Sequence, residues 1–225
     1  MIWQSVLTTI AFSILGYLIG SVSFSILFSK IFKKEDIRTK SSGNAGATNS
    51  MRNYGFGVGV LIMVLDMAKP ILAIIIAYVS SLFMHGDWKF IVLEVVGFFA
   101  VVGHIYPVFF NFKGGKGAAS YAGFLLILSW PLFFIGLFTF VAVLLITKKA
   151  SLASILGLTF TWISQILFSV IPHMSDGWAH MIPFWTPWWV GTIMLLLTII
   201  LVFFMHRGNI KRLLNGTERK IGQKK

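Results

Sequence analysis

Residues 188–204 read WWVGTIMLLLTIILVFF, and residues 205–212 continue as MHRGNIKR. The first part is an unbroken apolar run, close to the roughly 20 residues with which an α-helix crosses a bilayer. The second part turns basic at once, as chains do where they leave the membrane on its positive side. This stretch predicts a membrane-spanning helix followed by an exposed basic tail.

The composition extends this interpretation to the whole chain. Of the 225 residues, 57% are hydrophobic and 12% are charged, and the mean hydropathy is +0.85. Soluble domains carry roughly 25% charged residues, so we expect one integral-membrane domain over residues 1–225 with no separate soluble part. The net charge of +12 therefore does not indicate a nucleic-acid partner. The lack of cysteine excludes disulfides, thiolate catalysis and cysteine metal sites.

We predict an all-α, polytopic membrane helix bundle of about seven transmembrane helices. The expected spans lie near residues 6–28, 58–80, 90–110, 118–130, 131–146, 152–171 and 188–204. The fourth span would rise only about 20 Å, so the fourth and fifth could form a hairpin broken at Pro131, and six spans remain an alternative. Gly16 and Gly20 form a Gly-x-x-x-Gly pair, which predicts close helix packing.

The distribution of charge predicts the orientation. With seven spans and the N-terminus outside, every one of the 19 Lys and Arg residues except Lys69 and Lys89 lies in an inner loop or in the tail. Inner loops are enriched in Lys and Arg, so we expect the C-terminus in the cytoplasm. The outer loop over residues 172–189, rich in Trp, Pro and His, is expected to form an interfacial aromatic belt.

Three inner segments contain residue types that topology alone does not require. The first combines glycines, which let backbone N–H groups approach an anion, with neutral hydrogen-bonding side chains and an arginine suited to phosphate. A helix beginning near Gly46 would add its N-terminal amides. An ordinary polar connector is the alternative. The candidate binding residues are Ser42, Gly43, Asn44, Gly46, Thr48, Asn49 and Arg52.

The second segment interleaves glycines and lysines directly before an expected helix, a pattern that suits a phosphate cradle. It lacks the Gly-x-x-x-x-Gly-Lys-Ser/Thr spacing of nucleotide-binding loops, so ATP is not implied. A flexible turn with two topology-setting lysines is the alternative. His104, just upstream, is more typical of packing than of catalysis. The loop residues are Lys113, Gly114, Gly115, Lys116 and Gly117.

The third segment is the basic tail of the last span. His206 and Asn209 would lie on one face of a continuing helix, and Arg207 lies between them. Outside these segments, Asp66 and Lys69 are spaced i, i+3 within the second span. This spacing is equally consistent with an ion pair that positions the helix and with a catalytic role. Ser151 and Ser154 open the sixth span, and Ser151 could cap that helix.

Together, the stretches SGNAGATN at 42–49, GHIYP at 103–107 with FKGGKG at 112–117, and HRGNIKRLLNGTE at 206–218 resemble the signature segments of the bacterial acyl-phosphate:glycerol-3-phosphate acyltransferases, the PlsY family. The order matches, and the resemblance extends from Gly20 to Glu218. Pro70 stands where glycine is expected, and Gly208 where glutamate is common. The outer loop over residues 172–189 is longer than expected.

The resemblance implies a multi-pass enzyme of the bacterial cytoplasmic (inner) membrane, with its active site facing the cytoplasm. It would transfer an acyl group from acyl phosphate to the 1-hydroxyl of glycerol 3-phosphate, giving lysophosphatidate and phosphate without cofactor or metal. The enzyme that supplies acyl phosphate is a possible partner. Implied catalytic residues are His206, Asn209 and Ser42. The other candidate residues of the first and second segments, with Ser151, Ser154 and Arg207, would bind substrate. Asp66, Lys69 and Glu218 would be structural.

The residues fit this chemistry because both substrates carry phosphate and the acyl chain requires an apolar slot. No Ser-His-Asp arrangement and no His-x-x-x-x-Asp pair occurs, so we expect direct attack by the hydroxyl, with a substrate phosphate or His206 as proton acceptor and Asn209 orienting the reactants. One alternative is an anion transporter, motivated by Asp66 and Lys69. Another is a scaffold for anionic lipids, which would not need Asn44, Asn49 or Asn209.

Overall fold

The structure is a computed structural model, and it describes residues 2–170 and 188–221. Within these residues there are helices and no strands, which confirms the all-α membrane fold. The α-helices are α1 (Ile2–Gly20), α2 (Phe24–Phe32), α3 (Ala47–Tyr54), α4 (Phe56–Leu82), α5 (Leu93–Ile105), α6 (Ala118–Leu128), α7 (Trp130–Thr147), α8 (Ala150–Val170), α9 (Trp188–Met205) and α10 (Arg207–Leu214). Short 3-10 turns are η1 (Ile37–Thr39), η2 (Gly86–Lys89) and η3 (Val108–Phe110).

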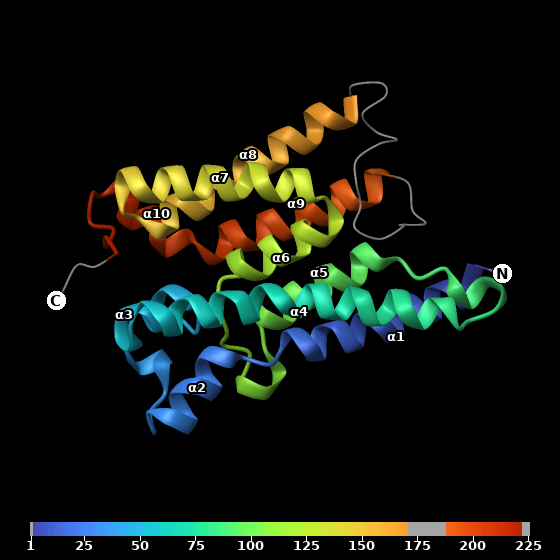
Figure 1. The fold of residues 1–225 in the computed structure, drawn as a ribbon, viewed down its shortest axis with the longest axis horizontal. Coiled ribbons are helices and arrows are strands. Elements are labelled where there is room, and N and C mark those ends of the chain that lie inside the picture. The colour runs from blue at the N-terminus through green and yellow to red at the C-terminus, as the bar shows by residue number, and fades with distance from the viewer. Residues whose placement is uncertain (1, 171–187, 222–225) are drawn as a thin grey trace.

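Among the described residues, five helical stretches are long and apolar enough to cross a membrane, and α9 with α10 forms a bent pair that can count as a sixth. The apolar α6 is shorter, as expected for the fourth span. Figure 1 shows α2, α3 and α10 at the opposite end of the bundle from the start of α1. An odd number of crossings produces this arrangement; the count of seven and the orientation remain predictions.

The first predicted span, residues 6–28, is not one helix. Helix α1 ends at Gly20 and α2 begins at Phe24. Gly20 lies directly against α5, where a Cβ atom would overlap the carbonyl oxygen of Ala100, and Gly16 lies against Val96 in the same way. The Gly-x-x-x-Gly pair is therefore a close helix contact, as expected. The break that follows it turns α2 toward the end of the bundle that holds α3 (Figure 1).

One other predicted span is also interrupted. The expected span 90–110 contains α5, which ends before Pro107 and is followed by η3. Between the fourth and fifth spans, the chain leaves helical geometry at Ser129, with φ −158° and ψ 100°, and Pro131 lies in the first turn of α7. The break therefore lies at Ser129, two residues before the expected position at Pro131. The predicted aromatic belt falls almost wholly outside the described residues.

Pro70 lies inside α4 without ending it. Proline has no N–H, so the carbonyl of the residue four positions earlier loses its helical donor. That residue is Asp66, and the Ser120 hydroxyl of α6 donates to its carbonyl oxygen at 3.1 Å. A side chain from a neighbouring helix thus replaces the missing hydrogen bond and ties α4 to α6.

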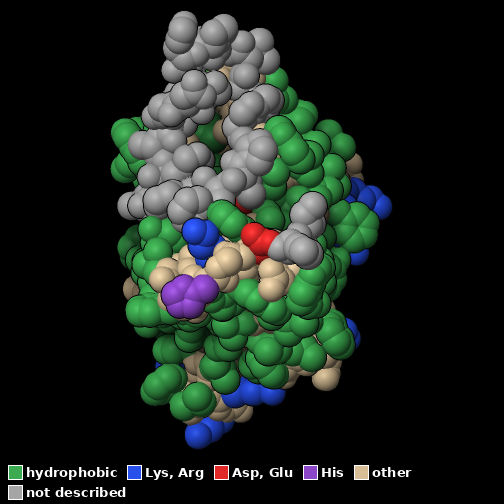
Figure 2. All heavy atoms as spheres, turned by 90° about the vertical axis from the view of Figure 1, so that its right-hand side faces the viewer, with side chains coloured by type: hydrophobic (Ala, Val, Ile, Leu, Met, Phe, Trp, Pro, Cys, Tyr) green, Lys and Arg blue, Asp and Glu red, His purple; other side chains and the backbone are tan. Residues whose placement is uncertain are grey.

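The bundle exposes large apolar side chains around its circumference, including Leu61, Phe138 and Ile200. This pattern is expected where the solvent is lipid. Figure 2 views the end where α1 begins and shows a mostly hydrophobic described surface with scattered charged side chains. The three polar segments lie at the other end, which agrees with the asymmetry expected from the sequence.

Candidate active site

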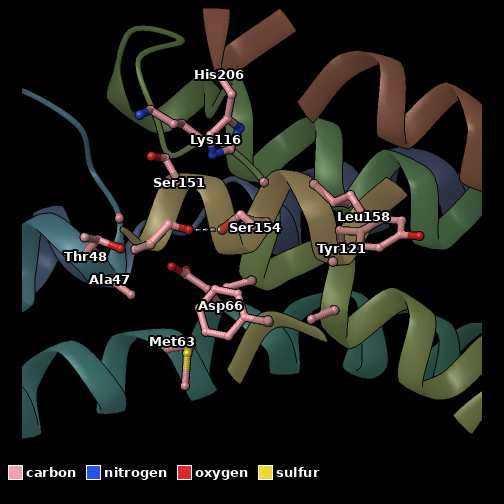
Figure 3. A pocket seen from close by; sticks show the side chains of 18 of the residues that line it. Ala47, Thr48, Met63, Asp66, Lys116, Tyr121, Ser151, Ser154, Leu158 and His206 are labelled. Carbon is pink, nitrogen blue, oxygen red and sulfur yellow. Dashed lines mark hydrogen bonds between the residues drawn. The ribbon is translucent and has the colours of Figure 1, made fainter. Parts of the chain in front are cut away.

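A cavity of about 330 Å³ opens between α3, α4, α6, α7, α8 and the α9–α10 junction. One end is polar and the other is apolar. Figure 3 shows Thr48 and Ser151 on one side of this space, with Tyr121 and Leu158 on the opposite side. Each of the three sequence segments contributes side chains to the polar end, so the structure brings together residues more than 150 positions apart.

The first segment reaches the cavity through the start of α3. The helix begins at Ala47, with Gly46 preceding it, and both residues line the cavity. This confirms the expected helix start near Gly46. Ser42, Asn44, Thr48 and Arg52 also line the cavity. Gly43 does not; it forms a turn with φ +71°, a conformation that favours glycine.

Asn49 was expected to bind substrate, but its amide is used to fold the loop. Its Nδ2 donates to the carbonyl oxygens of Ile37, Lys40 and Asn44, and its Oδ1 accepts from the Ser42 N–H at 3.2 Å. An amide has two donors and two acceptor lone pairs, so these bonds occupy most of its capacity. Asn49 therefore holds the first segment in shape at the edge of the cavity.

The second segment divides between two roles. Lys116 and Gly117 line the cavity, whereas Lys113, Gly114 and Gly115 do not. A Cβ atom at Gly114 would overlap the His104 carbonyl oxygen, and one at Gly115 would overlap His104 Nε2. These two glycines allow the loop to pack on His104. The expected cradle is thus reduced to Lys116 and Gly117, and the other residues support them.

The third segment does not form the continuing helix that the sequence predicted. The chain bends by 60° between α9 and α10, with His206 at the bend. His206 and Asn209 nevertheless both line the cavity. Arg207 does not: its guanidinium donates to the Phe204 carbonyl oxygen at 3.0 Å and lies 4.4 Å from the Phe204 ring centroid on the exposed side.

His206 has a defined orientation. Its Nδ1 lies 2.8 Å from the Val202 carbonyl oxygen. A carbonyl only accepts, so Nδ1 carries the proton, and in the neutral imidazole Nε2 then bears a lone pair. The ring is 4% exposed and lines the cavity. His206 is therefore built to accept a proton or a hydrogen bond at Nε2.

Glu218 organises the polar end from the C-terminal side. Its carboxylate accepts hydrogen bonds of 2.7 Å from the Ser151 hydroxyl, from Asn209 Nδ2 and from Arg212 Nε. Burial raises the pKa of Glu218, but these hydrogen bonds outweigh it and hold the pKa below its usual value. The amide oxygen of Asn209, Oδ1, accepts a hydrogen bond from the Lys116 ammonium. A continuous chain of contacts thus joins α8, α10 and the loop before α6.

The positive charge at this end is available for an anion. No ion pair within the described residues involves Arg52 or Lys116, and both line the cavity. Burial, with a smaller contribution from the positive charge of Arg212, lowers the pKa of Lys116 to about 8. A dianionic phosphate bound beside Lys116 would raise this pKa again, because a nearby negative charge favours the charged ammonium.

Asp66 and Lys69 form a buried ion pair of 2.7 Å inside α4. His104 Nδ1 lies 3.3 Å from each of them. Pairing reduces the cost of burying charges within a membrane protein, and it accounts for the intramembrane charges that motivated the transporter alternative. Asp66 and His104 also line the cavity, whereas Lys69 does not.

The apolar end is lined by side chains of α4, α6, α7 and α8. Its walls include Met63 and Met67 of α4, Leu137 and Phe140 of α7, and Ala122 of α6. Apolar walls of this kind suit a hydrocarbon chain. The predicted residues Ser151 and Ser154 stand near the junction of the two ends, where Ser154 donates to the Ala150 carbonyl oxygen at 2.9 Å.

Sequence reasoning missed two basic residues of the cavity wall, Arg212 and His104. Arg212 was interpreted as one more charge of the basic tail, yet it lines the cavity and pairs with Glu218. His104 was interpreted as a packing residue. No local spacing rule pairs Arg212 with Glu218, because helical neighbours are three or four residues apart and Glu218 lies beyond the end of α10. Within the described residues, no group of three His, Asp or Glu side chains could hold a metal ion.

Comparison with known proteins adds independent evidence. The family model "Glycerol-3-phosphate acyltransferase" matches residues 10–216. The chain belongs to the glycerol-3-phosphate acyltransferase family. It is 36% identical to the glycerol-3-phosphate acyltransferase of Mycoplasmopsis pulmonis over 96% of this chain and 94% of the relative. It is 38% identical to that of Mycoplasmopsis synoviae over 100% and 99% of the two chains.

Solved structures of the family share its fold. The crystal structure of PlsY (YgiH), an integral membrane glycerol 3-phosphate acyltransferase, superimposes in its glycerol 3-phosphate form with a TM-score of 0.77 and 32% identity, covering 95% of this chain and 96% of the other. The lysophosphatidic acid form gives a TM-score of 0.74 at 31% identity, with 95% of each chain covered. The resemblance to PlsY proteins and the membrane acyltransferase assignment are therefore confirmed.

Proposed function

We propose that this chain, as one integral-membrane domain, transfers a fatty acyl group from acyl phosphate to the 1-hydroxyl of glycerol 3-phosphate. The products are lysophosphatidate and inorganic phosphate, and the reaction is the first acylation of phospholipid biosynthesis. One observation carries the proposal: a single cavity joins Arg52 and Lys116, neither of which has an ion pair within the described residues, to an apolar branch lined by α4, α6, α7 and α8.

The geometry of the cavity supports acyl phosphate as the proposed donor. An acyl phosphate is an amphiphile whose phosphate suits the cationic end and whose chain suits the apolar branch. It is also a mixed anhydride with a good leaving group, so the transfer requires no further activation. Fixed positive groups near the leaving phosphate would stabilise the charge that develops there. Arg52, Lys116 and the first amides of α3 are the groups placed to do this.

In the proposed reaction, the glycerol 3-phosphate hydroxyl attacks the acyl carbon. The new ester C–O bond forms, the anhydride C–O bond breaks, and phosphate leaves with the bonding electrons. His206 Nε2 or a phosphate oxygen of a substrate accepts the hydroxyl proton. Ser42 and Thr48 offer hydroxyl contacts at the cavity edge. Asn209 holds Lys116 in place, and Glu218 holds Asn209.

The polar end of the cavity would face the cytoplasm of a bacterial cell, where glycerol 3-phosphate is dissolved. The apolar branch would lie within the inner membrane, in reach of a membrane-borne donor. The enzyme that makes acyl phosphate is then the proposed partner, because it would release its product into the same leaflet. The support is the concentration of Lys and Arg in the predicted inner loops.

The test is product analysis with the purified chain in lipid vesicles, supplied with palmitoyl phosphate and glycerol 3-phosphate. We expect lysophosphatidate and inorganic phosphate in a ratio of 1:1, both dependent on the protein. Release of phosphate without lysophosphatidate would contradict acyl transfer. Accumulation of labelled glycerol 3-phosphate inside sealed vesicles without any acyl donor would support the transporter alternative instead.

A further inference from the structure

The far end of the apolar branch is formed where α6, α7 and α8 meet. Tyr121, Gly136 and Thr161 line the cavity there, one from each helix. Figure 3 shows Tyr121 on the side of the cavity opposite Thr48 and Ser151. Along α8, Thr161 lies about 15 Å beyond Ser151, at a rise of ~1.5 Å per residue. These three residues are therefore far from the phosphate-binding end.

The hydrophobic core closes the branch at this level. Leu125 and Phe133 are the wall residues of α6 and α7 that lie furthest from the polar end. The next core residues, Leu128 and Leu132, are 4% and 1% exposed and do not line the cavity. Protein interiors are packed as densely as organic crystals, so a hydrocarbon chain that fills the branch has no room beyond this point.

A hydrogen bond joins two walls of the far end. The Thr161 hydroxyl donates to the Leu158 carbonyl oxygen at 2.8 Å, which uses its single hydrogen. In the 2.9 Å contact between Tyr121 and Thr161, the Tyr121 hydroxyl is therefore the donor. Both hydroxyl hydrogens are thus used within the protein. A wall without a free donor suits the apolar tip of a chain better than a polar ligand.

The third wall is the backbone of α7 at Gly136. A Cβ atom there would lie 2.7 Å from Cγ2 of Thr161, closer than real Cβ contacts. One methyl group, that of Thr161, therefore fills the space between α7 and α8. Removing this methyl deepens the branch, and adding one at Gly136 makes the branch shallower.

We propose that Tyr121, Gly136 and Thr161 determine which acyl-chain length the enzyme prefers. The Thr161 methyl and the Gly136 backbone form the floor that the terminal methyl of the chain meets. The hydrogen bond from Tyr121 fixes Thr161 in this position. The inference rests on the proposed function, which assigns the apolar branch to the acyl group of the donor.

The test is the profile of kcat/KM over a series of saturated acyl phosphates, from decanoyl to octadecanoyl, that includes the odd-numbered chains. Thr161→Ser keeps the hydroxyl and removes only the methyl. We expect the homologue one carbon longer than the wild-type optimum to gain about four- to tenfold relative to that optimum, the value of one methylene in an apolar pocket.

The matched control is Thr159→Ser, which removes the same methyl from the same helix. Thr159 does not line the cavity, and its hydroxyl donates to the Ile155 carbonyl oxygen at 2.9 Å. Its profile should keep the wild-type optimum. A purely structural role of Thr161 predicts equal losses at every chain length. Such uniform losses, or the same profile in Thr161→Ser and Thr159→Ser, would overturn the proposal.

Moving the methyl across the floor gives a second test. Gly136→Ala should shift the optimum toward shorter chains by the same factor. The double variant Gly136→Ala/Thr161→Ser replaces the lost methyl from the opposite helix, so its optimum should return to that of the wild type. It also removes the overlap at Thr161, and it supplies the comparison if Gly136→Ala does not fold. A double variant that keeps the profile of Thr161→Ser would contradict a floor shared by the two residues.

Calorimetric titration of the full chain in detergent with alkyl phosphates, from decyl to octadecyl, separates this inference from the donor assignment. If the wild type does not use acyl phosphates, the proposed function fails. The alkyl phosphate that binds most tightly should nevertheless be about one carbon longer for Thr161→Ser than for Thr159→Ser. The same optimum in both variants, or affinity independent of chain length in the wild type, would refute the floor.

Discussion

Replacing Lys116 with methionine removes one ammonium from the cavity while keeping a side chain of similar length. Lys116 has no ion pair within the described residues, and its single hydrogen bond is to the neutral Asn209. In the proposed reaction, the phosphate of a bound substrate is therefore its main counter-charge. A hydrogen bond between charged groups contributes about 1.5–3 kcal/mol, and about 1.4 kcal/mol corresponds to tenfold. We expect kcat/KM to fall by about 10- to 150-fold.

The matched control is Lys113→Met, which makes the same change three residues earlier in the same loop. Lys113 is exposed and does not line the cavity, so this variant should stay within about twofold of the wild type, as most surface substitutions do. The assay is the initial rate of lysophosphatidate formation in vesicles of fixed composition. Equal losses in the two variants would refute the reasoning, because a general effect of loop charge would then explain both.

Three further predictions test other parts of the account. Because the pKa of Lys116 is lowered to about 8, KM for the anionic substrates should rise as the pH is raised through 8, and Lys116→Arg should lack this rise; an identical pH profile would contradict the role of Lys116. Ala122→Phe should raise KM for palmitoyl phosphate but not for glycerol 3-phosphate, because it fills the apolar branch; equal effects on both would count against that branch as the acyl slot. Gly123→Ala should lower the unfolding temperature in detergent because its Cβ would overlap the Met67 carbonyl, whereas Gly57→Ala has open space and should not.

The fold was largely predictable because apolar runs and basic loops are local signals. The interruptions were not. The end of α1 at Gly20 depends on its contact with Ala100, 80 residues away, and the bend at His206 occurs without a proline. Neither the end of α1 nor the bend at His206 can be recognised from the neighbouring residues. Hydropathy alone therefore predicts longer and straighter helices.

The site was predicted as a set of segments, but the roles within it were not. A glycine can let a backbone approach an anion or let it pack on another residue, and Gly114 and Gly115 do the second, against His104. Asn49 and Arg212 show the same ambiguity, because an amide or a guanidinium binds loops and carboxylates as readily as substrates. Only the three-dimensional arrangement separates these uses.

The central claim is that the cavity is built for acyl phosphate. The most direct test is the ratio of kcat/KM for palmitoyl phosphate to that for palmitoyl-coenzyme A, measured with the purified chain and saturating glycerol 3-phosphate. We predict robust transfer from the phosphate and none detectable from the thioester. Robust transfer from palmitoyl-coenzyme A alone would contradict the account.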